Sequence, residues 1–366
     1  ASDLHVTQVF VSEVFDTNGV KELAAVEKDL AKVGIHLTRG PGNYAVAPGT
    51  VRKSDGTPYR VYTPFFIEWF KRNAGNPVVA SGLDVLKFVP EQYQTFNPKF
   101  DLGTKVIAGE ASAIKTLNRF LQSRVFDYDE LRNRADIGGT SHLSHALSHG
   151  EIHPRTILAA LPDGSGADVF RKEIAWREFY ADVLHHRPNS LTEYMEPRFA
   201  KMRYNEPKEQ FESWKFGKTG FPMVDAGMRQ LLETGWMHNR VRMIVASFLV
   251  KDLHIEWQLG AQWFEQHLTD FDPASNSHGW QWTAGCGTDA SPYYRIFNPI
   301  SQGYKFDPNG DYVRRFVPEL RHLAGAAALE PWEHGHGYSK GYQKRMVDHS
   351  AERLEALTRL EDLKAL

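Results

Sequence analysis

The segment from residue 214 to residue 300 decides what kind of fold and site this chain forms. It contains Gly-Trp-Met-His-Asn-Arg-Val-Arg-Met at 235–243, Asp-Phe-Asp at 270–272 and Asn-Ser-His-Gly-Trp-Gln-Trp at 276–282. A buried indole N–H needs a partner, and arginine and aspartate are almost never buried unless they are paired. This mixture therefore indicates a pocket for a flat, electron-rich ligand, in which Arg242 pairs with one of the two aspartates, rather than an apolar core.

The region around Arg242 has the pattern of a helix with two different sides. Asn239, Arg242 and Met243 share one side, while apolar residues occupy most of the rest of the segment 238–252. A helix divided in this way lies with one side in a core and the other in a cavity. We expect this helix to form one wall of the pocket.

Helical periodicity continues over most of the chain beyond Gly109. Ser165 is a candidate N-cap for the third of the expected helices, and Gly235 is a candidate end for the fourth. The expected helices cover residues 110–122, 141–149, 166–186, 223–234, 238–252, 260–268 and 351–363.

The N-terminal part follows a different pattern. The run Val-Thr-Gln-Val-Phe-Val at 6–11 predicts a buried parallel strand. Residues 20–33 predict a helix that ends at Gly34, and Ile35 begins a second strand. So small a parallel sheet leaves a bare edge and an uncovered apolar face. The predicted fold class is α/β plus all-α: a partial, Rossmann-like α/β layer at 1–48, a linker at 49–105 and a large helical domain at 106–366.

Composition limits the function further. The chain has 366 residues, a formal net charge of -2 and a single cysteine, Cys286. One cysteine excludes an intrachain disulfide, and the net charge requires any contact with nucleic acid to come from a local basic patch. No apolar run approaches the ~18–20 residues of a membrane span. We expect a cytoplasmic monomer without a metal, and we interpret His142, His145 and His149 as structural or surface residues despite their helical spacing.

The motifs quoted above, in this order, closely resemble the flavin-binding domain of the DNA photolyase and cryptochrome family, and most of all the class I cyclobutane pyrimidine dimer photolyases of microbes. The resemblance runs from Val6 to about Leu357. It implies a deoxyribodipyrimidine photolyase, in which light-excited, reduced FAD donates an electron to a flipped-out dimer in damaged DNA; photolyases are a standard example of base flipping. Family members normally begin with a Trp-Phe-Arg-Arg-Asp-Leu-Arg-like strand that this chain does not contain, so we expect a chain that starts within the α/β domain.

Residues 139–144, Gly-Thr-Ser-His-Leu-Ser, form the first motif of the site. Hydroxyls and free N–H groups at the start of a helix bind phosphate, although ordinary N-capping explains such a motif as well. The resemblance implies that this motif holds the FAD diphosphate, with His142 where many relatives carry arginine. In full, it assigns FAD contacts to Tyr128, Thr140, Ser141, His142, Leu143, Ser144, Glu173, Arg177, Asn239, Arg242, Asp270, Asp272 and Asn276.

The expected helix 166–186 carries Glu173, Trp176 and Arg177 on one face. An intrahelical Glu173–Arg177 pair, worth only ~0.3–0.5 kcal/mol, explains this spacing as well as a base-binding surface does. The resemblance favours lesion and DNA binding. It assigns that role to Arg132, Trp176, Arg177, Asn239, Arg240, Met243, Trp282 and Arg295.

The resemblance also implies which residues take part in the reaction. Asn276 stands where the family faces flavin N5, and plant cryptochromes carry aspartate there, which favours repair over signalling. Trp280 and Trp257 match the first two members of an electron-transfer chain, in which Tyr204 replaces the usual third tryptophan. The complete set is Glu173, Asn276, Met243, Trp280, Trp257 and Tyr204. The alternatives are a cryptochrome-type blue-light photoreceptor without repair activity and a fragment that fails to fold, and the sequence does not identify an antenna chromophore of folate or deazaflavin type.

Overall fold

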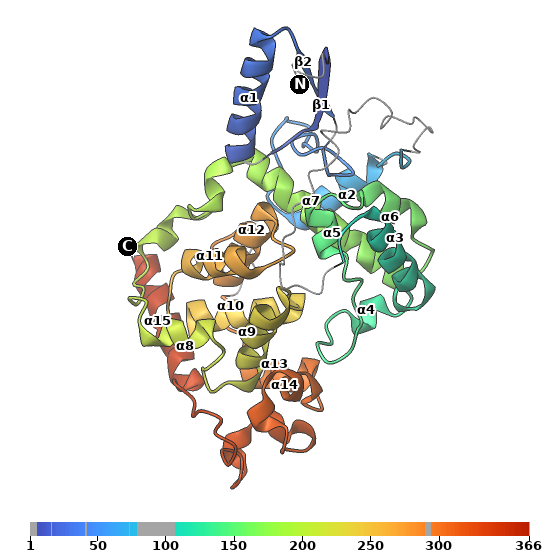
Figure 1. Cartoon of the computed structure of the whole chain (residues 1–366). Coiled ribbons are helices and arrows are strands. Elements are labelled where there is room, and N and C mark those ends of the chain that lie inside the picture. The colour runs from blue at the N-terminus through green and yellow to red at the C-terminus, as the bar shows by residue number, and fades with distance from the viewer. Residues whose placement is uncertain are drawn as a thin grey trace.

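The structure is a computed structural model that describes residues 6–15, 17–40, 42–72, 74–78, 107–289 and 294–365. A small α/β lobe projects from one end of a larger helical body (Figure 1). The two-stranded parallel sheet and the helical body confirm the predicted fold class. None of the described helices is long and apolar enough to cross a membrane.

The α/β lobe consists of β1 (Gln8–Ser12), α1 (Thr17–Lys32) and β2 (His36–Gly40). The strands are parallel, with Gln8 opposite His36, and α1 forms the crossover between them. Gly34 follows α1 with a φ of 74°, a left-handed conformation that glycine adopts without a steric penalty. The two strands and the helix therefore lie where the sequence predicts them.

The lobe differs from the prediction in its burial. The sequence predicts a buried first strand, but exposed and half-buried residues alternate along β1, and Phe10 is 72% exposed. Parallel strands are buried where helices cover both faces of their sheet, and the described part of the lobe contains one helix. The expected uncovered apolar face is therefore present, and the expected burial is not.

The next segment crosses from the lobe to the body and contains α2 (Tyr62–Lys71), a helix that the sequence predicts only as part of a linker. Phe65 and Trp69 of α2 are buried against Phe179 of α7 (Ser165–His186). Residues 79–105 of the predicted linker lie outside the described residues.

Glu178 anchors this segment to α7. Its carboxylate is buried and accepts hydrogen bonds from the backbone N–H groups of Ala45 and Val46. It also accepts a hydrogen bond of 2.5 Å from Trp69 Nε1. A buried carboxylate is tolerated because its oxygens are hydrogen-bonded, so this group joins three separate points of the segment to the body.

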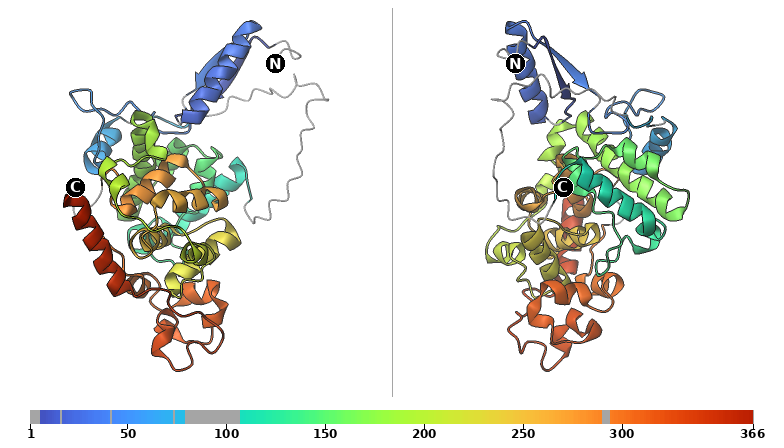
Figure 2. Two further views of the ribbon diagram at one scale, coloured as in Figure 1. Left: turned by 90° about the vertical axis from the view of Figure 1, so that its left-hand side faces the viewer. Right: turned by 45° about the vertical axis from the view of Figure 1, so that its right-hand side comes forward.

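The helical body is assembled from many short helices and a few long ones. Besides α2 and α7, these are α3 (Glu110–Arg119), α4 (Tyr128–Leu131), α5 (Ser144–Ser148), α6 (Pro154–Ala160), α8 (Glu209–Lys215), α9 (Pro222–Thr234), α10 (Asn239–Lys251), α11 (Trp257–His267), α12 (Pro273–Ala284), α13 (Pro299–Phe306), α14 (Asp311–Phe316) and α15 (His349–Ala365). All of the expected helices are present. Figure 2 shows α15, in dark red, lying along the outside of the body.

The ends of the helices test the capping residues that the sequence predicts. Gly235 ends α9 in the left-handed conformation, with a φ of 67°, as expected. Ser165 is the first residue of α7, and Gly164 takes the N-cap position, so the predicted cap is wrong by one residue. The sequence prediction did not include α12, although Asp272 accepts a hydrogen bond of 2.7 Å from Ser275 N and Pro273 follows it, which is a common helix start.

Helix α10 lies in the middle of the core. Val241, Val245, Phe248 and Leu249 are completely buried, and α9 and α12 pack on either side of the helix. Helix α10 thus connects the apolar centre of the body with the polar residues at its own N-terminal end. That end lies beside the candidate site.

Candidate functional site

A cavity of about 790 Å³ opens between the segment before α5, the end of α9 and α14. Thr140, Ser141 and His142 line one side, and Trp236 and His238 line another. Its volume lies within the roughly 300–1,000 Å³ that small-molecule sites occupy. The cavity therefore contains part of the predicted phosphate-binding motif.

The motif before α5 has an unusual backbone. His142 has a φ of 55°, and non-glycine residues in this left-handed region are uncommon outside turns and functional sites. Its ring lies 4.6 Å from that of Trp236, and Trp236 Nε1 donates a hydrogen bond of 3.2 Å to Ser144 Oγ. Ser141 Oγ accepts from Leu143 N at 3.3 Å, while the Leu143 side chain is buried. These contacts fix the motif at the cavity wall.

Three arginines line the same cavity and were not found from the sequence. Arg119 ends α3, Arg124 lies in the π-helical turn after α3, and Arg315 belongs to α14. Arg119 and Arg124 are close in the sequence, but Arg315 comes from a distant helix, so only the folded structure brings all three together. They give the cavity fixed positive charge that His142 alone does not provide.

Arg242 and Asp270 form the ion pair that the sequence predicts. Arg242 Nη2 lies 3.0 and 2.7 Å from the two carboxylate oxygens of Asp270, and Arg242 Nε donates to the carbonyl of Met237 at 2.8 Å. The Asp270 side chain is almost completely buried. Asp272, the alternative partner, instead caps α12.

Trp257 and Trp280, two of the three aromatic residues expected to carry electrons, lie on α11 and α12, and the third, Tyr204, lies in the loop before α8. A Cβ atom at Gly260 would lie 2.2 Å from Trp280 Cη2, so the glycine is what allows the indole to pack directly on α11. Trp257 lies at the start of α11, and its ring centroid is 6.1 Å from that of Tyr194. Tyr194 in turn lies 6.3 Å from Tyr204. The sequence did not indicate Tyr194, because its neighbours come together only in the fold.

Asn276 lies beside this group, and its Nδ2 donates a hydrogen bond of 3.0 Å to the carbonyl of Ala261. The bond fixes the amide between α11 and α12. Met243, on the expected side of α10, is half-buried, and Asn239 at the start of that helix is exposed. Tyr128 is buried edge-on against Phe120 and Phe170, as part of a core.

The residues on the expected base-binding face of α7 contact residues of other elements. Glu173 pairs with Arg132 and not with Arg177, so the intrahelical alternative is not formed. Trp176 stacks face to face on Tyr62, at 3.7 Å between ring centroids and 8° between planes. Arg177 donates to two backbone carbonyls, at 2.8 and 3.2 Å, and this leaves fewer of its donors for the expected phosphate contact.

Positive charge gathers around Glu173. Burial lowers the pKa of Arg240, and the neighbouring charges of Arg132 and Arg295 lower it further, whereas Glu173 opposes the shift. Arg240 donates to Asn133 Oδ1 at 3.1 and 2.8 Å, and Arg295 is exposed. Arg132, Arg240 and Arg295, which are far apart in the sequence, thus form one basic patch.

The remaining expected residues complete the surroundings. Trp282 is half-buried, and its Nε1 donates a hydrogen bond of 3.1 Å to the carbonyl of Asp289. Among the described residues, no group of histidine, cysteine, aspartate and glutamate side chains is arranged to hold a metal ion.

Comparison with known proteins gives matches over the whole chain. A family model described as the FAD binding domain of DNA photolyase matches residues 170–362, and one described as DNA photolyase matches residues 1–81. A deoxyribodipyrimidine photo-lyase of Alkalihalophilus pseudofirmus is 40% identical, over 91% of this chain and 74% of that protein.

Solved structures match equally widely. A bacterial class III photolyase from Agrobacterium tumefaciens superposes with a TM-score of 0.87 and 36% identity, over 100% of this chain and 81% of that one. A cryptochrome from Synechocystis superposes with a TM-score of 0.82 and 26% identity, over 96% and 79% of the two chains. The fold thus resembles both repair enzymes and a cryptochrome.

Proposed function

Because the chain belongs to the DNA photolyase family, we propose that it is a deoxyribodipyrimidine photo-lyase, which uses light and FAD to split cyclobutane pyrimidine dimers in DNA. The observation that carries this proposal is that the FAD-binding match covers α10, the turn between α11 and α12, and α12, which supply Arg242, Asp270 and Trp280. The class I assignment stays a prediction from the sequence.

The chemistry of the cavity fits FAD. A diphosphate is bound best by hydroxyls, free N–H groups and guanidinium groups, and the cavity offers these from Thr140, Ser141 and its three arginines. His238 Nε2 is buried without a hydrogen-bond partner in the described part of the chain and lies at the cavity wall. In this proposal Thr140, Ser141 and Ser144 hold the diphosphate, with His142 and Leu143 shaping the turn.

The ring system of FAD would lie against α10 and α12. The Arg242–Asp270 pair and the Asp272 carboxylate supply polar groups there, and Asn276 offers an amide that both donates and accepts. When bound and fully reduced, FAD supplies the light-excited electron that splits the dimer. The protein's own contribution is to orient the ring, exclude water and hold the lesion beside it.

The lesion would enter between α7 and α12. Tyr62 stacks on one ring face of Trp176 and holds the half-buried indole in place, and a base would stack on the part of the indole that stays exposed. With Trp282, it would supply stacking of roughly 1–3 kcal/mol per base. Burial raises the pKa of Glu173, and the Arg132 guanidinium paired with it opposes that rise. In this proposal Arg132 orients Glu173 toward the bases, and Met243 and Asn239 complete the contacts.

The basic patch of Arg132, Arg240 and Arg295 would bind the phosphates around the flipped-out bases.

We also place the protein in the cytoplasm as a monomer. Cys286, its single cysteine, is buried, and burial raises the pKa of the thiol to about 12, so the thiol is unreactive.

The test is repair of a dimer-containing oligonucleotide under blue light by the purified protein with its FAD reduced. The expected result is restoration of intact pyrimidines in the light and none in the dark. Protein that retains FAD and binds DNA but repairs nothing supports the alternative, a photoreceptor. Protein that retains no flavin contradicts both functions.

A further inference from the structure

Tyr194 lies between two residues of the expected electron-transfer chain. Its ring is 6.1 Å from that of Trp257, at 89° between planes, and 6.3 Å from that of Tyr204, at 20°. Trp257 and Tyr194 are buried, whereas Tyr204 is only partly buried at the edge of the core. The three rings form a continuous aromatic path from the core toward solvent.

The hydroxyl of Tyr194 has a proton acceptor. It donates a hydrogen bond of 3.0 Å to Glu256 Oε1. Burial raises the pKa of Tyr194, and a hydrogen bond from Tyr204 opposes part of that rise. The donors therefore run in order from Tyr204 to Tyr194 to Glu256, and Glu256 is half-buried, so it can exchange a proton with solvent.

The tryptophans differ from Tyr194 in this respect. The indole N–H groups of Trp257 and Trp280 are buried and reach no acceptor within the part of the chain that the structure describes. An indole that loses an electron but keeps its proton stays a charged, strong oxidant. A phenol that loses an electron and passes its proton to a carboxylate becomes a neutral radical of lower energy. This difference favours electron transfer from Tyr194 to an oxidised Trp257.

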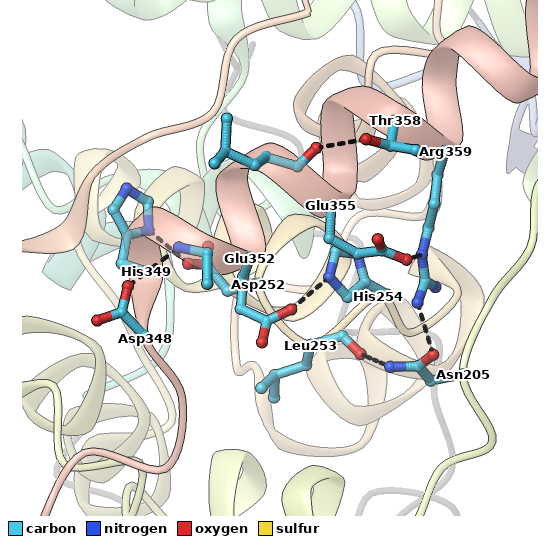
Figure 3. A network of polar contacts seen from close by, with 12 residues as sticks. Asn205, Asp252, Leu253, His254, Asp348, His349, Glu352, Glu355, Thr358 and Arg359 are labelled. Atoms are coloured by element: carbon cyan, nitrogen blue, oxygen red, sulfur yellow. Dashed lines mark hydrogen bonds and ion pairs between the residues drawn. The ribbon is translucent and has the colours of Figure 1, made fainter.

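Arg359 of α15 holds the loop that carries Tyr204 on both sides, and Figure 3 shows its contact with Asn205. Arg359 of α15 donates through Nη1 to the carbonyl of Arg203 at 2.7 Å and through Nη2 to Asn205 Oδ1 at 3.0 Å. Because Arg203 and Asn205 flank Tyr204, these bonds fix its backbone beside Tyr194. The end of the aromatic path is thus a defined position and not a free loop.

We propose that Tyr194 relays the oxidising equivalent from Trp257 to Tyr204 and that Glu256 accepts its proton. This rests on the proposed function, because light-excited, oxidised flavin is the oxidant that first draws an electron through Trp280 and Trp257. Tyr194 gives one electron to the Trp257 radical cation and its phenolic proton to Glu256. Tyr204 then gives Tyr194 an electron and a proton, Glu256 releases its proton to solvent, and an external thiol supplies Tyr204 with an electron and a proton.

A purely structural role for the same residues makes a different prediction. A buried tyrosine with a hydrogen-bonded hydroxyl is an ordinary core residue, and its replacement lowers stability. Such a role leaves radical chemistry unchanged. The experiment must therefore detect the radicals themselves.

In the experiment, the FAD-containing protein with oxidised flavin is excited by a laser flash. Transient absorption and electron paramagnetic resonance then follow tryptophan and tyrosine radicals in H₂O and D₂O. The wild-type chain is expected to convert its tryptophan radical into a tyrosyl radical, more slowly in D₂O. Tyr194→Phe and Glu256→Gln are expected to lose both the tyrosyl signal and the isotope effect.

Glu256→Gln keeps the Tyr194 ring in place, so it tests the proton acceptor even where Tyr194→Phe fails to fold. The matched control is Tyr304→Phe, which removes another tyrosine–glutamate hydrogen bond, of 2.8 Å to Glu330, on the surface and outside the aromatic path. It should behave as the wild type does.

Flavin content and dimer repair, measured on the same preparations, separate the possible failures. A wild-type chain without flavin or repair contradicts the proposed function. A chain with both, in which Tyr194→Phe leaves the tryptophan radical decay and the tyrosyl signal unchanged, overturns only the relay. A tyrosyl signal that survives in Glu256→Gln with its isotope effect intact overturns the role of Glu256.

Discussion

Phe248 in α10 and Phe10 in β1 have the same side chain but very different surroundings. Phe248 is completely buried, and Phe10 is 72% exposed. The body surrounds its central helix with α9 and α12, whereas in the described lobe β1 pairs with β2 and α1 packs against β2. Burial of apolar surface, and with it most of the stabilisation, is therefore concentrated in the helical body.

The ion pairs of the two regions differ in the same way. Asp270 in the body is 2% exposed and pairs with Arg242, while the Lys32–Asp29 pair of α1 keeps 65% and 72% of its side-chain surfaces exposed. Water screens the exposed pair, so it contributes little. The contrast predicts that equal substitutions have unequal effects in the two regions.

The largest difference is expected for the two phenylalanines. Phe248→Ala should lower the free energy of unfolding by about 3–5 kcal/mol, because it leaves a cavity in a closed core. Phe10→Ala should change it by less than about 0.5 kcal/mol, because the side chain already contacts water. Denaturant unfolding of both variants measures this, and equal losses would show that the lobe is as well packed as the body.

The two aspartates should differ next. Asp270→Ala leaves Arg242 unpaired beside a buried position, and we expect a loss of about 3 kcal/mol together with loss of bound FAD. Asp29→Ala should cost no more than about 1 kcal/mol and leave the flavin in place. Flavin absorbance after gel filtration and thermal melting test both statements; an Asp270→Ala protein with full flavin and normal melting would contradict the assignment.

DNA binding should depend on the body alone, and through two kinds of residue. Trp176→Ala should weaken binding of dimer-containing duplex by roughly 1–3 kcal/mol and hardly affect undamaged duplex. Arg295→Ala should weaken both and lower the salt slope by about 1. Arg39→Ala in β2 is the control and should change neither affinity. Equal losses on both duplexes for Trp176→Ala would rule out stacking.

The smallest expected effect is a dependence of folding stability on pH. His278 is buried between Ser190 Oγ, at 2.9 Å, and the carbonyl of Ala274, at 2.8 Å, and burial lowers its pKa to about 4. Between about pH 6.5 and pH 4 the unfolded chain binds this proton and the folded chain does not, so stability falls as pH falls through that window. The contribution reaches at most about 1.4 kcal/mol per pH unit. His278→Gln should have a shallower acid slope in melting temperature, and an unchanged slope would contradict this.

The sequence predicted most of what depends on local spacing. The parallel strands and the long helices follow from periodicity, and the pairing of Arg242 with one of two aspartates follows from the rule that buried charges are paired. Helix α12 was missed because its two tryptophans stand among small and polar residues without an apolar period, although Asp272 followed by proline marks its start.

Features that depend on tertiary contacts were beyond the sequence. Arg119, Arg124 and Arg315 reach one cavity from separate helices, and Tyr194 meets its partners only after the loops around α11 fold. The burial of β1 was predicted wrongly for the same reason, since burial depends on what covers a strand and not on its own residues.

The carboxylate of Glu178 has a consequence for the order of folding. It joins Ala45 to a position 133 residues further along the chain and Val46 to one 132 residues further along. Contacts so distant in sequence form late, because the intervening chain must first be ordered. Until residues 45 and 46 dock on α7, the Glu178 carboxylate is unsatisfied on the side of α7 that is buried in the folded protein. We therefore expect the docking of the N-terminal segment to be the slow, final step in the folding of the body. Glu178→Gln should increase the rate of this step, because it removes the charge that is unsatisfied before docking.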